Sequence, residues 1–74
     1  MLHARKDYMR IQDPAGLIPE DEPVFLLRAQ DISAAGTVLD WAARQPQGKA
    51  RELAIKHAVL MSQWPVKKTA DVPE

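Results

Sequence analysis

The chain contains no cysteine, few aromatic residues and no long apolar run. Without cysteine it can form neither a disulfide framework nor a thiolate metal site, and its two histidines alone cannot complete a tetrahedral zinc shell. Its apolar runs, such as Val24–Leu27, fall far short of the ~20 residues that span a bilayer, and the N-terminus lacks the apolar region of a signal peptide. We therefore expect a cytoplasmic protein that makes no contact with membranes.

The chain contains few glycines and has no formal net charge. The three glycines are isolated, which excludes a phosphate-cradling loop, and the acidic residues 20–22 lack the spacing of a calcium loop. Ten lysines and arginines balance ten aspartates and glutamates, whereas nucleic-acid-binding domains are usually basic. We expect no catalytic residue, no cofactor and no bound metal.

The length of 74 residues suits one small domain, spanning residues 1–74, with flexible tails at 1–6 and 66–74. A chain of this size buries only about 60% of the surface that it exposes when unfolded. Its stability is therefore marginal unless something else contributes. With disulfides and thiolate-bound metal excluded, self-association is the contribution that remains.

The first third of the chain predicts a β-hairpin. Residues 7–12 alternate loosely in polarity, Asp13–Gly16 has strong turn chemistry, and the run 23–29 is rich in β-branched and aromatic residues. These features predict two short strands that pair antiparallel. A short helix with Asp21 as N-cap and Pro23 in its first turn is the competing interpretation.

The remainder predicts an antiparallel pair of helices. After Asp31 or Ser33 as N-cap, apolar residues at helical spacing continue to about residue 44, where Pro46 and Gly48 interrupt the pattern. A second helix is predicted over residues 49–64 and is stopped by Pro65. The overall prediction is an α+β fold in which a short N-terminal extended segment or β-hairpin packs on a two-helix hairpin, with an all-α fold as the alternative.

The second helix carries an apolar stripe that predicts its buried face. Leu53, Leu60 and Trp64 are expected in the core, and His57, at the centre of the stripe, is expected to be a hydrogen-bonded packing residue rather than a base or metal ligand. The whole stripe consists of Ala50, Leu53, Ala54, His57, Leu60, Met61 and Trp64.

Three residues are predicted to bind a partner. Ile55 and Val59 form a second apolar ridge away from the main stripe, and a helix that is apolar on two faces needs a second cover, either the N-terminal hairpin or another copy of the chain. Trp41 lies at the edge of the apolar face of the first helix, and tryptophan is enriched at the centres of protein interfaces.

Two segments carry a resemblance to known sequences. Glu22–Asp31, which reads EPVFLLRAQD, and Trp64–Lys68, which reads WPVKK, resemble segments of short uncharacterised proteins of bacteria and their prophages. The resemblance brings no activity and no site residues. It implies a phage- or mobile-element-associated protein that acts by binding.

The sequence therefore predicts a small non-enzymatic protein-binding module that forms a homo-oligomer and binds a protein partner of unknown identity. The alternative is a nucleic-acid-binding protein that uses the basic helix 49–64, with Lys49, Arg51 and Lys56, in an arrangement like a helix-turn-helix.

Overall fold

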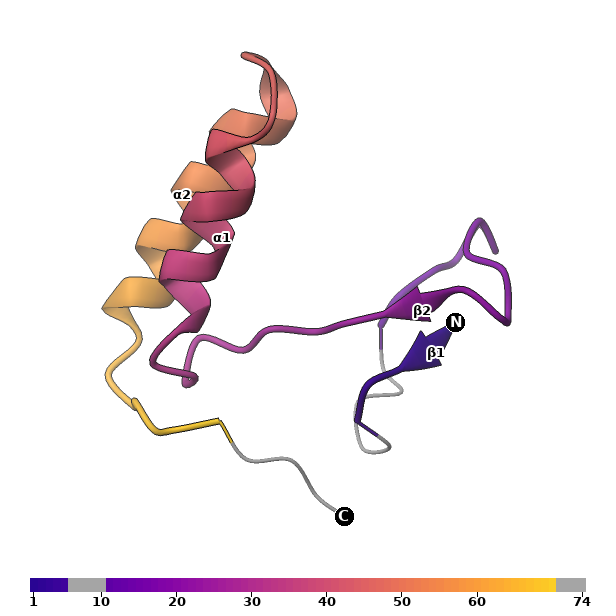
Figure 1. Cartoon of the computed structure of the whole chain (residues 1–74), viewed down its shortest axis with the longest axis horizontal. Helices are drawn as coiled ribbons and strands as arrows, with labels where there is room; N and C mark the ends of the chain where they lie inside the picture. Colours follow the sequence, from indigo (N-terminus) through magenta and orange to yellow (C-terminus); the bar gives the residue numbers. More distant parts are fainter. Residues whose placement is uncertain (6–10, 71–74) are drawn as a thin grey trace. The chain divides into compact units, whose positions relative to one another are not determined.

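The computed structural model describes residues 1–5 and 11–70 (Figure 1). Its elements in chain order are β1 (Leu2–His3), β2 (Pro23–Val24), α1 (Ala34–Ala43) and α2 (Lys49–Gln63). The fold is a mixed α+β fold that is mostly helical, with two helices packed together and a small two-stranded sheet. The chain forms two compact units, one with the described residues up to Leu26 and one over residues 27–70.

In the first unit, β1 and β2 pair in parallel. Leu2 lies opposite Pro23 and His3 opposite Val24, and the Leu2 N–H donates to the Glu22 carbonyl over 2.7 Å. The partner of β2 is therefore a parallel strand at residues 2–3, whereas the sequence predicts an antiparallel partner at residues 7–12. Of the expected first strand, residues 7–10 lie outside the described residues. The expected second strand ends at Val24, and residues 25–29 are not part of a strand. The β-propensity of a residue measures how well its side chain fits the surface of a sheet, and it does not supply a neighbouring strand.

The predicted turn after Asp13 is confirmed. The Asp13 carboxylate accepts backbone hydrogen bonds from Leu17 and Ile18, both over 3.0 Å, and its carbonyl accepts one from Gly16. Gly16 has a φ of 63°, in the left-handed region that glycine adopts without steric cost. This aspartate-centred turn fixes the direction of the chain within the segment that connects the two strands.

In the second unit, Asp31 organises the start of α1. Ser33 is the N-cap residue, but its own side chain makes no capping bond. Instead the Asp31 carboxylate accepts hydrogen bonds from the Ser33 backbone N–H over 2.9 Å and from the Ser33 hydroxyl over 2.7 Å. These two bonds hold the pKa of the Asp31 carboxyl below its ordinary value, and the bond from the backbone N–H has the larger effect.

This arrangement predicts a loss of stability in acid. Because the folded pKa of Asp31 lies below the unfolded one, its ionised carboxylate stabilises the fold above the unfolded value of about 4, and this contribution is lost as the pH falls through the folded value. Thermal unfolding should show that Asp31→Asn lowers the midpoint at neutral pH. The difference from the wild type should narrow below about pH 4. A difference independent of pH would contradict a role for the charged carboxylate.

The second helix ends where the sequence predicts. It begins after Gly48, whose φ of 156° favours glycine, and Trp64 after its last residue has extended backbone ahead of Pro65. The loop of residues 44–48 is short and turns the chain back, so that α2 runs antiparallel to α1 (Figure 1). The predicted helical hairpin is confirmed.

The two helices meet along a seam of small side chains. The buried apolar residues of the described chain are Ala34, Ala42, Ala54, Ala58 and Met61. On α2 the seam residues recur at i, i+4 and i+7, so they share one side of the helix. Alanine leaves so little side chain between two backbones that the helices can approach closely, and we name these five residues the alanine seam.

The predicted buried stripe of α2 is confirmed at Ala54 and Met61 but is wrong at its three largest residues. Leu53, Leu60 and Trp64 are 65%, 60% and 52% exposed. They recur at a helical spacing as regular as that of the alanine seam, but on a neighbouring side of the helix. The sequence interpretation treated the whole stripe as buried, whereas the helices pack through the edge of the stripe nearest the seam and leave its largest residues exposed.

Residues after α2 close the open end of the hairpin. Lys68 forms a parallel bridge with Asp31, in which its N–H donates to the Gln30 carbonyl over 2.7 Å and its carbonyl accepts from the Ile32 N–H over 3.1 Å. The Lys67 ammonium donates to the carbonyls of Met61 and Ala29, over 2.6 and 2.8 Å. The segment expected to be a loose tail thus makes specific bonds at these two residues, while residues 71–74 lie outside the described residues.

Candidate protein-binding surfaces

The large apolar side chains of the helical hairpin lie on its surface. Seven of them on α1, α2 and the residue after α2 are between 41% and 65% exposed, while four of the five buried apolar residues are alanines. This distribution reverses the usual one, in which leucine, isoleucine and phenylalanine fill the interior. The exposed set is Leu39, Trp41, Leu53, Ile55, Val59, Leu60 and Trp64.

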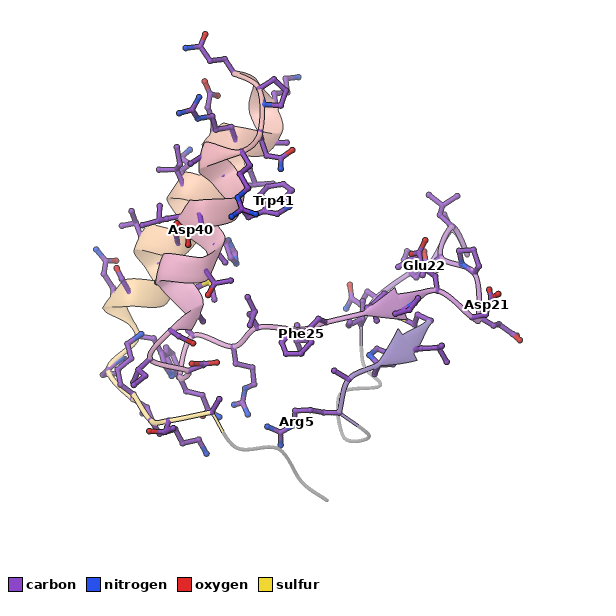
Figure 2. All side chains as sticks on the ribbon, viewed as in Figure 1. Arg5, Asp21, Glu22, Phe25, Asp40 and Trp41 are labelled. Carbon is purple, nitrogen blue, oxygen red and sulfur yellow. The ribbon has the colours of Figure 1, made fainter. Side chains whose placement is uncertain are left out.

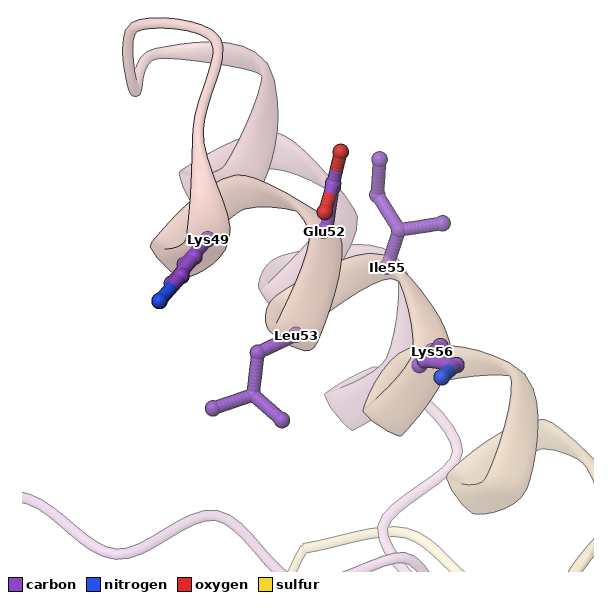
Figure 3. A pocket seen from close by; sticks show the side chains of 5 residues that line it. All are labelled: Lys49, Glu52, Leu53, Ile55 and Lys56. Carbon is purple, nitrogen blue, oxygen red and sulfur yellow. The ribbon is translucent and has the colours of Figure 1, made fainter.

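These residues fall on opposite sides of the alanine seam. At about 100° per residue, the row of Leu53 and Leu60 lies about 130° to one side of Ala54 and Ala58 on α2, and the row of Ile55 and Val59 lies about 100° to the other. Figure 3 shows Leu53 and Ile55 leaving α2 in different directions. The hairpin is therefore a two-helix layer with an apolar surface on each side.

The first surface, which we name the tryptophan face, consists of Trp41, Leu53, Leu60 and Trp64. Trp41 belongs to it because, in an antiparallel pair of right-handed helices, the side of α1 that carries Trp41 adjoins the side of α2 that carries Leu53. Figure 2 shows the Trp41 indole projecting from the side of α1. His57 lies within the same row and is exposed, so its predicted place in the core is wrong.

The second surface, which we name the isoleucine face, consists of Leu39, Ile55 and Val59, which are 46%, 41% and 48% exposed. The three predicted partner-binding residues are thus all accessible, but the structure does not bring them together. Ile55 and Val59 lie on the isoleucine face, and Trp41 lies on the tryptophan face. The sequence analysis missed Leu39, Leu53 and Leu60 as surface residues, because it lacked the position of the seam.

A polar strip separates the two faces along the outer side of α2. An open hollow there is lined by Lys49, Glu52, Leu53, Ile55 and Lys56, all from one helix (Figure 3). A ligand pocket usually encloses its ligand between several elements. This hollow is lined by one helix and contains charged side chains of both signs, so it is not a ligand pocket. It marks the boundary between the two apolar faces.

The basic residues of α2 do not form one surface. Lys49 and Lys56 lie on the outer side of the helix with Glu52 between them, whereas Arg51 is half-buried beside the alanine seam. A nucleic-acid-binding helix presents its basic side chains together, along the phosphate backbone. The arrangement offers no support to the nucleic-acid alternative.

Within residues 1–5 and 11–70, no group of three or more histidine, aspartate or glutamate side chains is placed to hold a metal ion. Over the same residues, no helix is long and apolar enough to cross a membrane. Comparison of the chain with known protein families, with characterised proteins and with solved structures finds no match. The two apolar faces are the features of the described chain that call for a functional explanation.

Proposed function

We propose that this chain is a non-enzymatic protein-binding module and that its helical hairpin is the binding element. The observation that carries the proposal is the exposure of seven large apolar side chains on a hairpin whose own seam is made of alanines and one methionine. Contiguous apolar surface on a small protein marks a site of interaction or a liability to aggregate. Two such faces separated by a polar strip have the pattern of binding surfaces.

The composition of the faces supports a protein as the partner. Large apolar side chains form both faces, with charged residues of α2 at their borders, and the centres of protein interfaces are depleted in charge and enriched in aromatic side chains. Trp41 and Trp64 are half-exposed, and tryptophan is the residue type most enriched among those that dominate binding energy. The resemblance of two segments to short prophage-type proteins fits a small protein that acts on a host protein by binding it.

We assign the partner protein to the isoleucine face. Ile55 and Val59 are aliphatic, lie one turn apart on α2 and continue into Leu39 on α1, so a partner helix or strand could contact both helices at once. The face is smaller than the tryptophan face, as suits a transient partner rather than a permanent one.

A capture experiment tests the proposed function. The immobilised wild type should retain a specific protein from a bacterial lysate, before and after nuclease treatment, and Ile55→Lys/Val59→Lys should lose it, because charges would be buried against the partner. Glu52→Lys/Gln63→Lys, at exposed positions on the outer side of the same helix, is the matched control and should retain it.

Two results would contradict the proposal. Retention that disappears with nuclease would indicate nucleic-acid binding. Retention that the isoleucine-face substitutions leave unchanged, in a variant whose circular dichroism shows intact helices, would show that this face does not bind the partner.

A further inference from the structure

We infer that the tryptophan face binds a second copy of this chain, so that the protein is a homodimer held together by its helical hairpins. This inference rests on the proposed function in one respect, that the hairpin is the binding element. It moves the self-association predicted from the sequence away from Ile55 and Val59 to the opposite side of the hairpin.

The spacing along α2 is that of helices that pair with each other. The row on the tryptophan face recurs in alternating steps of three and four residues: Ala50, Leu53, His57, Leu60 and Trp64. Four of these five residues are apolar, and apolar residues at this spacing pack as knobs into the holes of a facing helix. The hairpin uses a different row of α2 for its own seam, Ala54, Ala58 and Met61. The row on the tryptophan face therefore has no facing helix in the hairpin itself.

The residues of this row suit a second copy. None is an acid or a strong base, and the chain has a formal net charge of zero, so no net repulsion opposes the approach of two copies. A two-fold interface must be complementary to itself. The smallest side chain, Ala50, lies at one end of the row and the largest, Trp64, at the other, so an antiparallel copy places each indole towards the end where the facing helix has the most room.

The available area agrees with a weak, concentration-dependent dimer. Half-exposed tryptophans and leucines offer about 100 Å² each, so the four residues of the face offer about 400 Å² per copy and about 800 Å² for the pair. Ala50, His57 and the apolar stems of Lys49 and Lys56 border the face and add to this area. The sum lies in the range of weak complexes, below about 1,200 Å², where stable interfaces begin.

The wild-type protein already contains the probe for a first experiment. Its two tryptophans both lie on the tryptophan face, and the isoleucine face has none. On concentration from nanomolar to high micromolar, the mass from light scattering should double, and tryptophan emission should shift to shorter wavelength over the same range.

Three results would overturn the inference. A dimer that forms without any change in emission would place the interface elsewhere. A monomer with water-like emission at every concentration would exclude self-association. A monomer whose emission stays at short wavelength on dilution would show that another part of the same chain covers the face.

Two neighbouring substitutions supply the second experiment. Leu60→Lys should weaken dimerisation about tenfold or more, because the charge would be buried between copies, while Val59→Lys on the isoleucine face should leave the dimer constant unchanged. Both side chains are exposed in the hairpin, so circular dichroism should show both variants folded. If Val59→Lys weakens the dimer and Leu60→Lys does not, the inference is wrong.

The two proposals fail separately. A protein that stays monomeric but still captures a partner through the isoleucine face would refute the dimer and keep the proposed function. A protein that dimerises through the tryptophan face but captures no partner would keep the dimer and refute the proposed function.

Discussion

Replacement of Ala42 by leucine is expected to unfold much of the helical hairpin, whereas the same replacement at the next residue should leave it folded. Ala42 is 1% exposed in the alanine seam, and extra carbon atoms there would push α1 and α2 apart. Overpacking of this kind costs about 1–3 kcal/mol, a large part of the stability of a small domain. Urea unfolding followed by far-ultraviolet circular dichroism measures the loss.

Ala43 supplies the matched control. It is exposed on the same helix, so Ala43→Leu changes the sequence in the same way without touching the seam. Its free energy of unfolding should stay within about 0.5 kcal/mol of the wild type. Equal losses for the two variants would mean that the helices do not meet at Ala42.

Truncation of Met61 to alanine is expected to destabilise the protein by about 2–5 kcal/mol, the range for large-to-small changes at buried positions. Met61 is 8% exposed and is the only large side chain in the alanine seam. Its loss would leave a cavity near the end of α2, where Lys67 donates to the Met61 carbonyl. Thermal unfolding of the wild type and the variant at low micromolar concentration measures the difference.

The loss of stability in Leu60→Ala, compared with that in Met61→Ala, distinguishes the packing seen in the structure from the packing predicted from the sequence. Leu60 precedes Met61 and is 60% exposed, so its truncation should cost less than about 1 kcal/mol in the monomer. The sequence interpretation places both residues on the buried stripe and predicts that Leu60→Ala, too, costs about 2–5 kcal/mol. A loss of that size for Leu60→Ala would restore that interpretation.

The helices could be predicted from the sequence because their signals are local. The proline and glycine of the loop, the stop at Pro65 and the capping region at Asp31 and Ser33 each act within a few residues. The packing side of α2 could be predicted only in part, because the predicted stripe contains the buried Ala54 and Met61 at one edge but also the exposed Leu53 and Leu60. Hydrophobicity favours the row of Leu53 and Leu60, whereas close approach of two backbones favours the row of Ala54 and Ala58.

The pairing of the two strands could not be predicted from the sequence, for a different reason. The parallel pairing of Leu2 with Pro23 joins residues far apart in the chain, and no local turn signal specifies such a partner. The apolar run after Pro23 indicates extended structure but not how far a sheet will follow it. Asp13 is a contrasting case, since its turn depends only on the next few residues and was predicted.

The candidate site could be predicted in part. The exposure of Ile55, Val59 and Trp41 follows from their positions outside the main stripe of each helix. Their division between two faces depends on where the seam runs, which no single helix determines. Once the seam is known, the same helical arithmetic that misplaced Leu53 assigns it to the tryptophan face with Trp41.

The central claim, that large apolar side chains of α2 lie outside the fold and a smaller set holds it together, can be tested by thiol labelling. Since the chain has no cysteine, Leu60→Cys and Met61→Cys each introduce one thiol at adjacent positions. At concentrations below self-association, Leu60→Cys should react as fast as an unfolded peptide and Met61→Cys about tenfold or more slowly, because opening of the seam must precede reaction. A protected thiol at position 60 with a reactive one at position 61 would contradict the account.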